Sequence, residues 1–122
     1  MQFPNNWPEN CPPADAVIAE GEVYRIVCNA PPNNSDFQTH FETGKMPKGD
    51  LCLRCGLSVF RIAIDAVHMR NKYPKLGNQI AKGTLQKNHG KTKQTGTSSH
   101  TTWWIYENVD RASLFTCVTD EA

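Results

Sequence analysis

The sequence has no apolar run that approaches the roughly 18 residues of a membrane-spanning helix, so we expect no contact with a membrane. Its first residues, MQFPNNWPENCPP, have neither the basic start nor the apolar stretch of a secretory signal, which favours a cytoplasmic protein. The 122 residues are too few for a (β/α)₈ barrel of about 250 residues. Eight glycines and eight prolines argue against a helical bundle. We therefore expect one loop-rich domain over residues 1–122.

The cysteines are five, an odd number that is unlike the even sets of secreted disulfide scaffolds. In a cytoplasmic protein we expect reduced thiols. Cys52 and Cys55 form a C-x-x-C pair and His68 follows at zinc-finger spacing, but residues 72–74 offer no fourth ligand, so we expect no metal. The alternatives are a redox-active pair, or a zinc site completed by a distant residue. The candidates for that distant ligand are His40, Cys28 and Cys117.

Acidic residues are missing from the stretch 70–93, although the whole chain has a net charge of only +1. Residues 1–44 hold six acidic residues against Arg25, and residues 45–93 hold eleven basic residues against two acidic ones. Such a stretch attracts a polyanion, which predicts weak contact with nucleic acid; the alternative is a solvated basic face balanced by the acidic ends. The basic residues of 70–93 are Arg70, Lys72, Lys75, Lys82, Lys87, Lys91 and Lys93.

The local patterns alternate between strands and short helices. Residues 1–14 are expected to form an irregular arm that Trp7 and Cys11 attach to the body, and the polar, Lys- and Gly-rich residues 86–99 a long mobile loop. Together the patterns predict an α+β fold, with a mostly antiparallel sheet and one or two helices. Helical structure is expected at 15–20, 36–43 and 62–73, and strands at 22–27, 52–60 (its C-terminal part), 79–85, 101–106 and 114–119.

His100 follows two serines and precedes two threonines at the start of the strand 101–106. A histidine beside hydroxyl groups can act as an acid or base, or hold a phosphate. The motif His-x-Thr is also found in two-histidine phosphodiesterases, but those enzymes need two copies and the other histidines here have no partner threonine. The alternative is a histidine that caps the strand end.

A second group of candidates is spread over three predicted strands. Arg25 beside Tyr24 can grip a pyrophosphate with two parallel hydrogen bonds. Ser58 opens the next strand and can position a ribose, while Glu107 can stabilise the charge of an oxocarbenium-like transition state. The alternative is a surface ion pair between Arg25 and Glu20, Glu22 or Glu107.

The order of Tyr24-Arg25, the strand Gly56-x-Ser58-x-Phe60, a helix and the late Glu107 resembles small bacterial NAD-using domains of the ADP-ribosyltransferase-like class. That class includes toxin domains named for an Arg, a Glu and a Ser. The resemblance implies an enzyme that cleaves or transfers at the nicotinamide–ribose bond of NAD, with Arg25, Ser58 and Glu107 in the three named positions. The chain has no Glu-x-Glu before its last strands, and His100 would take part of the catalytic glutamate's place.

These candidates predict a nucleotide site in which Arg25, Ser58 and His100 share one cleft, with the loop 86–99 as its lid. Because neighbours on a strand point to opposite faces, one of Trp103 and Trp104 is expected in the core, and the other is expected to face outward or to line the cleft. In the cleft it would pack on a base or ring together with Tyr24. The rival hypotheses are a non-catalytic nucleic-acid-binding domain that uses residues 70–93, and an accessory protein with no chemistry.

Overall fold

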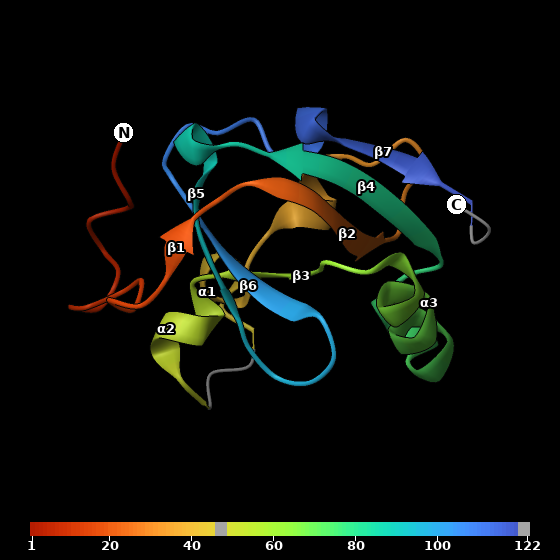
Figure 1. The fold of residues 1–122 in the computed structure, drawn as a ribbon, viewed down its shortest axis with the longest axis horizontal. Helices are drawn as coiled ribbons and strands as arrows, with labels where there is room; N and C mark the ends of the chain where they lie inside the picture. Colours follow the sequence, from red (N-terminus) through yellow and green to blue (C-terminus); the bar gives the residue numbers. More distant parts are fainter. Residues whose placement is uncertain (46–48, 120–122) are drawn as a thin grey trace.

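The computed structural model describes residues 1–45 and 49–119. In these residues seven strands form one antiparallel sheet with the order β1-β5-β6-β3-β2-β4-β7 (Figure 1). The α+β class and the mostly antiparallel sheet are therefore confirmed. The strands are β1 (Val17–Ile18), β2 (Gly21–Val27), β3 (Leu57–Phe60), β4 (Gln79–Leu85), β5 (Gly90–Gln94), β6 (His100–Ile105) and β7 (Phe115–Val118).

Three α-helices accompany this sheet in the described residues, and only α3 is longer than about one turn. They are α1 (His40–Thr43), α2 (Leu51–Arg54) and α3 (Ala63–Lys72). Short 3₁₀ turns complete the structure: η1 (Asn34–Phe37), η2 (Pro74–Leu76), η3 (Lys87–His89) and η4 (Ala112–Leu114).

The two faces of the sheet bury different sets of side chains. The main core includes Val23, Val27, Leu57, Val59 and Trp103, which lie on one face with Phe37 and Phe115 packed among them. On the other face α3 covers a smaller cluster built on Phe60, Ala66, Val67 and Ile80. The alternation of buried residues along β2, which the strand pattern predicts, is therefore what divides the two clusters.

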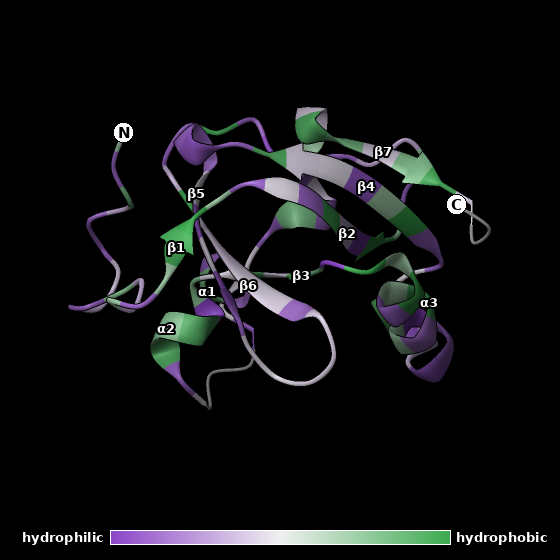
Figure 2. Cartoon of the chain, viewed as in Figure 1, coloured by the Kyte–Doolittle hydropathy of each residue, from purple (hydrophilic) through white to green (hydrophobic). Residues whose placement is uncertain are grey.

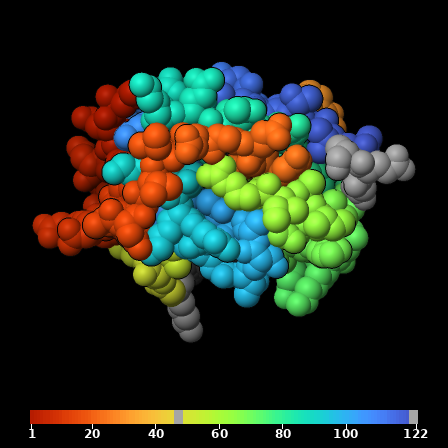
Figure 3. Space-filling model, viewed as in Figure 1, coloured from red at the N-terminus to blue at the C-terminus, as the bar shows by residue number. Residues whose placement is uncertain are grey.

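The N-terminal arm has no helix or strand through residue 14, as expected, and it covers a third cluster around the buried Trp104. Phe3, Trp7 and Cys11 pack against this cluster, and Figure 3 shows the arm in red along one end of the molecule. A disulfide joins Cys11 to Cys52 in α2. The prediction of reduced thiols is therefore wrong for these two residues, because the fold brings together cysteines that are 41 positions apart.

The expected loop at 86–99 is the largest error in the predicted elements. Residues 90–94 form β5, which lies between β1 and β6, with Gly90 and Thr92 buried and Lys91 and Lys93 half-buried. Gly90 has a φ of 132°, and a Cβ there would collide with the carbonyl oxygen of Trp104. The glycine and lysine residues of this segment therefore did not predict a strand. At Gly90 the close approach of two backbones excludes the β-branched side chains by which strands are usually recognised.

Two shorter predictions also differ from the structure. Residues 15–20 contain β1 in place of a helical turn, because Val17 and Ile18 pair with Lys91 and Thr92 of β5. The helix expected at 36–43 is divided into η1 and α1, because Thr39 and Glu42 form a capping box that starts a new helix. Figure 2 shows β1 and much of α2 in the green of hydrophobic residues, and Val17, Ile18, Leu51 and Leu53 of these elements are exposed.

Candidate functional site

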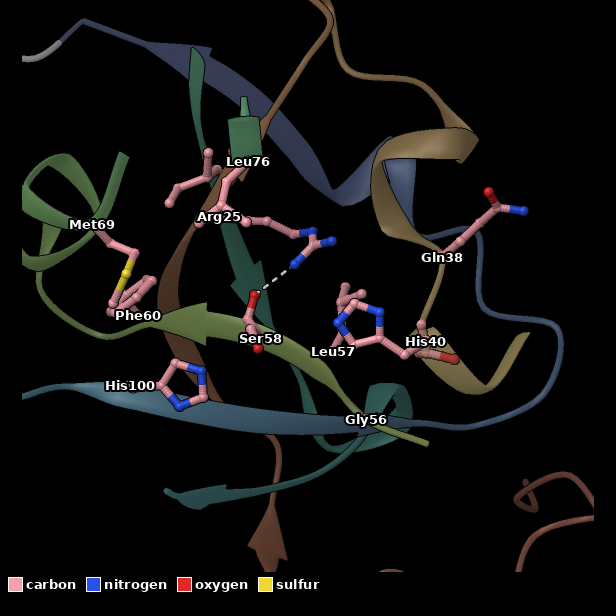
Figure 4. Close-up of a pocket in the computed structure, with 12 residues that line it drawn as sticks. Arg25, Gln38, His40, Gly56, Leu57, Ser58, Phe60, Met69, Leu76 and His100 are labelled. Atoms are coloured by element: carbon pink, nitrogen blue, oxygen red, sulfur yellow. Dashed lines mark hydrogen bonds between the residues drawn. The ribbon is translucent and has the colours of Figure 1, made fainter. Parts of the chain in front are cut away.

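A cavity of about 240 Å³ opens where β2 and β3 separate from each other (Figure 4). In the described chain, β2 pairs with β4 along seven residues but with β3 only at Tyr24 and Phe60. Beyond this pair the described residues of the two strands show no backbone pairing with each other, and residues 38–40, Met69 of α3 and Leu76 of η2 line the gap between them. The residues that line the cavity are Arg25, Ile26, Gln38, Thr39, His40, Gly56, Leu57, Ser58, Phe60, Met69, Leu76 and His100.

Arg25 bridges the two diverging strands. Its Nη1 donates to the backbone oxygen of Ser58 at 2.7 Å, and its Nε donates to the backbone oxygen of Asp36 at 2.8 Å. The guanidinium also lies 5.8 Å from the ring centre of Phe37. Burial lowers the pKa of Arg25 to about 10, against the opposing effect of the Asp36 carboxylate, so the side chain keeps its charge at neutral pH. The alternative of an ion pair with Glu22 is wrong, since Glu22 pairs with Lys82 at 2.8 Å.

Asp36 holds the loop that carries one wall of the cavity. Its carboxylate accepts hydrogen bonds from the backbone N–H groups of Cys28 and Asn33 and from the amide of Asn29. Burial by itself would raise the pKa of this carboxyl, but the hydrogen bonds, together with the charge of Arg25, hold it below the ordinary value of 3.8. The ionised Asp36 therefore fixes η1, whose backbone oxygen in turn receives Arg25.

His100 is oriented by the turn that precedes it. Its Nδ1 lies 2.9 Å from the backbone oxygen of Thr95, and a carbonyl can only accept, so Nδ1 carries the hydrogen. The hydroxyl of Thr95 lies 3.1 Å from the same nitrogen and 2.7 Å from the hydroxyl of Thr102. The ring meets the ring of Phe60 edge-on, with 5.4 Å between centroids. Within the described chain Nε2 has no hydrogen-bond partner, which leaves it free for a ligand.

The turn at residues 95–99 is fixed to the start of α3. Asp65 accepts from the backbone N–H of Ser99 at 3.0 Å, and the hydroxyl of Ser99 accepts from the N–H of Ile62 at 3.0 Å. The carbonyl of Ser99 accepts from the N–H of Arg61. The lid expected from residues 86–99 is therefore wrong: β5 belongs to the sheet, the turn is anchored, and neither lines the cavity.

Arg25, Ser58 and His100 line the same cavity, as the sequence predicted, but not from the same face of the sheet. Tyr24 pairs with Phe60, and Phe60 pairs with His100, so these side chains share one face. Arg25, next to Tyr24, points to the opposite face. It reaches the cavity only because the gap between β2 and β3 opens the sheet at this point.

The two tryptophans do not form part of this cavity. They lie on opposite faces of β6, as expected, but both are completely buried, so the expectation that one lines the cleft is wrong. Trp103 Nε1 donates to the backbone oxygen of His89 and Trp104 Nε1 donates to that of Cys52. Each face of the sheet has a core of its own, so each indole finds an apolar environment and a hydrogen-bond acceptor.

Two further candidates also lie outside the cavity. The ring of Tyr24 packs against the cluster under α3. Glu107 is exposed, and it lines a separate depression with Met1, Gln2 and His89. Glu107 follows β6 at the end opposite to His100, because the six residues of that strand separate the two positions. No carboxylate therefore stands among the described residues that line the cavity.

His40 is the cavity residue that the sequence predictions missed, since they name it as a possible distant metal ligand and not as a member of the cleft. It is the first residue of α1, directly after Thr39, whose hydroxyl accepts from the N–H of Glu42 at 3.1 Å. Arg111 holds the other side of this helix through two bonds to the Glu42 carboxylate, at 2.7 and 2.8 Å. The capping sequence Thr39-x-x-Glu42 is a signal that could have placed His40 at a helix start.

The basic residues of 70–93 are distributed over α3, η2, β4, η3 and β5, and none of them lines the cavity. Lys82 pairs with Glu22, and Lys93 pairs with Asp15 at 2.9 Å. The positive charge of this stretch that is available to a partner is therefore smaller than the number of its basic residues indicates. Binding of nucleic acid by this stretch stays a prediction.

Comparison with known proteins gives no relative to guide the assignment: no family model, no curated protein and no solved structure matches this chain. Across residues 1–45 and 49–119, no three side chains of His, Cys, Asp or Glu gather as a metal site would require. None of the helices in that part of the chain has the length and apolar character to cross a membrane. The cavity itself must therefore carry the functional argument.

Proposed function

We propose that this domain binds a small anionic molecule of the nucleotide class in the cavity between β2 and β3. One observation carries the proposal: Arg25, His40 and His100 line the cavity, and its described lining contains no Asp or Glu. A guanidinium and two imidazoles are groups that hold phosphate. The carboxylate of Asp36 offsets part of the charge of Arg25, but it does not line the cavity, so it does not repel an anion from inside it.

The apolar part of the lining supports a ring-bearing ligand. Leu57, Phe60, Met69 and Leu76 give the cavity an apolar wall beside these polar groups, a combination that is typical of small-molecule sites. Its volume of about 240 Å³ is below the roughly 300–1,000 Å³ of sites for drug-sized ligands. A base or a nicotinamide ring with one phosphate fits inside this volume, and the rest of a larger ligand such as a dinucleotide would extend beyond it.

Cleavage at the nicotinamide–ribose bond of NAD, in the manner of the ADP-ribosyltransferase-like class, remains a further proposal. Ser58 and His100 support it, because both line the cavity. Glu107 weakens it, because its carboxylate lies in a separate depression and cannot stabilise an oxocarbenium ion beside Arg25. Binding is therefore the function that we favour, and release of nicotinamide from NAD, measured by chromatography, tests the cleavage.

Calorimetric titration with AMP, nicotinamide mononucleotide, NAD and uncharged adenosine tests the binding proposal. Calorimetry suits this site better than tryptophan fluorescence, because none of the three tryptophans lines the cavity. We expect the phosphate-bearing ligands to bind at least about 10-fold more tightly than adenosine, since a charge-assisted contact contributes about 1.5–3 kcal/mol.

His40→Ala provides the matched test of the site, because His40 is exposed and its ring makes no hydrogen bond within the described residues. We expect this variant to weaken AMP binding several-fold. His68→Ala, on the exposed side of α3 and outside the cavity, is the control and should bind as the unmodified protein does. Equal affinity for AMP and adenosine, or no binding at millimolar concentration, would refute the proposal.

A further inference from the structure

We propose that His40 and His100 act as a general acid and a general base that cleave single-stranded RNA without a metal ion. This inference rests on the proposed function, since it requires that the cavity accept a nucleotide phosphate. The two imidazoles come from different elements, α1 and β6, and Figure 4 shows them on opposite sides of Ser58. Neither is used by the rest of the fold for an ion pair within the described residues.

The base is His100, and its hydrogen bond to the backbone oxygen of Thr95 determines which ring nitrogen can accept a proton. With Nδ1 donating to that carbonyl at 2.9 Å, neutral His100 has its lone pair on Nε2. The hydroxyl of Thr102, bonded to that of Thr95, and the edge of Phe60 keep the imidazole in place. A base that is oriented by a third group is the arrangement that proton abstraction requires.

The acid is His40, at the first position of α1. The capping box of Thr39 and Glu42 and the two bonds from Arg111 to Glu42 fix the backbone of this helix. The ring itself is exposed, so it can exchange protons with water after each turnover. His100 is half-buried, and the two histidines therefore differ in their access to solvent as well as in their hydrogen bonding.

The reaction is an internal transfer of the phosphodiester. The 2′-oxygen of a ribose attacks the adjacent phosphorus, and its proton passes to Nε2 of His100. The bond between phosphorus and the 5′-oxygen breaks, and the leaving oxygen takes a proton from the imidazolium of His40. The products are a 2′,3′-cyclic phosphate and a 5′-hydroxyl, and solvent returns both histidines to their starting states. Arg25, fixed at the cavity by Ser58 and Asp36, stabilises the negative charge that gathers on the phosphoryl oxygens.

The test uses the dinucleotide UpA in the presence of EDTA, with products identified by mass spectrometry. We expect a 2′,3′-cyclic phosphate to appear. His40→Ala and His100→Asn should each lower the rate by about 10²-fold or more, the usual contribution of a general acid or base. Asparagine at position 100 keeps an N–H near Thr95 and removes Nε2, so it tests the base with the least disturbance of the fold. His68→Ala should leave the rate unchanged.

The 2′-deoxy analogue dUpA separates the two proposals, because it has no attacking hydroxyl and can only bind. If dUpA binds and UpA stays intact, the inference is overturned while the proposed function stands. If neither dinucleotide nor AMP binds, both fail. Cleavage that survives His40→Ala and His100→Asn, or that falls equally in His68→Ala, would also overturn the inference, because it would come from elsewhere in the sample.

Discussion

Arg25 is expected to hold β2 and β3 together where their own backbone pairing has ended, and its replacement by methionine tests this. Methionine keeps an unbranched stem of similar reach but cannot donate to the carbonyls of Ser58 and Asp36, which Arg25 reaches at 2.7 and 2.8 Å. The variant should therefore lose stability even when no ligand is present.

The magnitude follows from the bonds that are lost. A hydrogen bond to a charged group contributes about 1.5–3 kcal/mol, and we take the lower end for each of the two because the site is partly open to water. The contact with the ring of Phe37, at 5.8 Å, adds about 0.5 kcal/mol. Arg25→Met should thus cost about 3.5 kcal/mol, and Arg25→Lys about half as much, because an ammonium reaches one carbonyl more easily than both.

Urea denaturation followed by tryptophan fluorescence measures the loss, since the buried Trp103 and Trp104 report on both faces of the sheet. With a slope of about 1–3 kcal/mol per molar urea, the midpoint should fall by roughly 1–3 M. Lys82→Met is the matched control on the neighbouring strand: its ion pair with Glu22 is on the surface and should contribute less than about 1 kcal/mol. A loss below 1 kcal/mol in Arg25→Met would refute the bridging role.

Three further predictions concern the disulfide, one carboxylate and the free thiols. Reduction, or Cys11→Ser, should destabilise the protein by about 4 kcal/mol, the loop-closure entropy for residues separated by 41 positions, and unchanged urea midpoints with and without reductant would contradict this. Because the folded-state pKa of Asp36 lies below the ordinary 3.8, its contribution is present above that pH and is lost as the pH falls through the folded pKa. Asp36→Asn should therefore reduce the acid sensitivity of the thermal midpoint below pH 4, and a parallel pH profile would show that another group is responsible. Burial raises the pKa of Cys55 to about 11, so in the folded protein iodoacetamide should label the exposed Cys28 and leave Cys55 unmodified, as peptide mass mapping would reveal.

The parts of the fold that were predictable from sequence are those in which the pattern of apolar and polar residues matches the pattern of buried and exposed positions. The strand expected at 22–27, the helix expected at 62–73 and the strand expected at 101–106 correspond to β2, α3 and β6. The stretch 86–99 failed because β5 is specified by what packs on it. Gly90 and the buried Thr92 pair with Ile105 and Trp103 of β6. The residue types of β5 do not by themselves predict that it is a strand of this sheet.

The cavity was predictable only in outline. Arg25, Ser58 and His100 were found from their chemistry, but Trp103, Trp104 and Glu107 were assigned to the site by their position in the chain. Whether a strand residue faces a cleft depends on which face of the sheet is covered, and here both faces are. His40 was missed because it enters the site from α1, a single-turn helix that has no periodicity of its own.

The strand order also has a consequence for the time course of folding. β1 and β2 are only two residues apart in the chain, yet the sheet separates them by β5, β6 and β3. β1 can pair only after β5 has been synthesised, and β3 can form its four-residue pairing with β6 only after β6 has been synthesised. During synthesis the N-terminal half therefore has few partners of its own. Contacts so distant in sequence place such a domain among the slow, millisecond-to-second folders, whose sheet is completed only after the last quarter of the chain has left the ribosome.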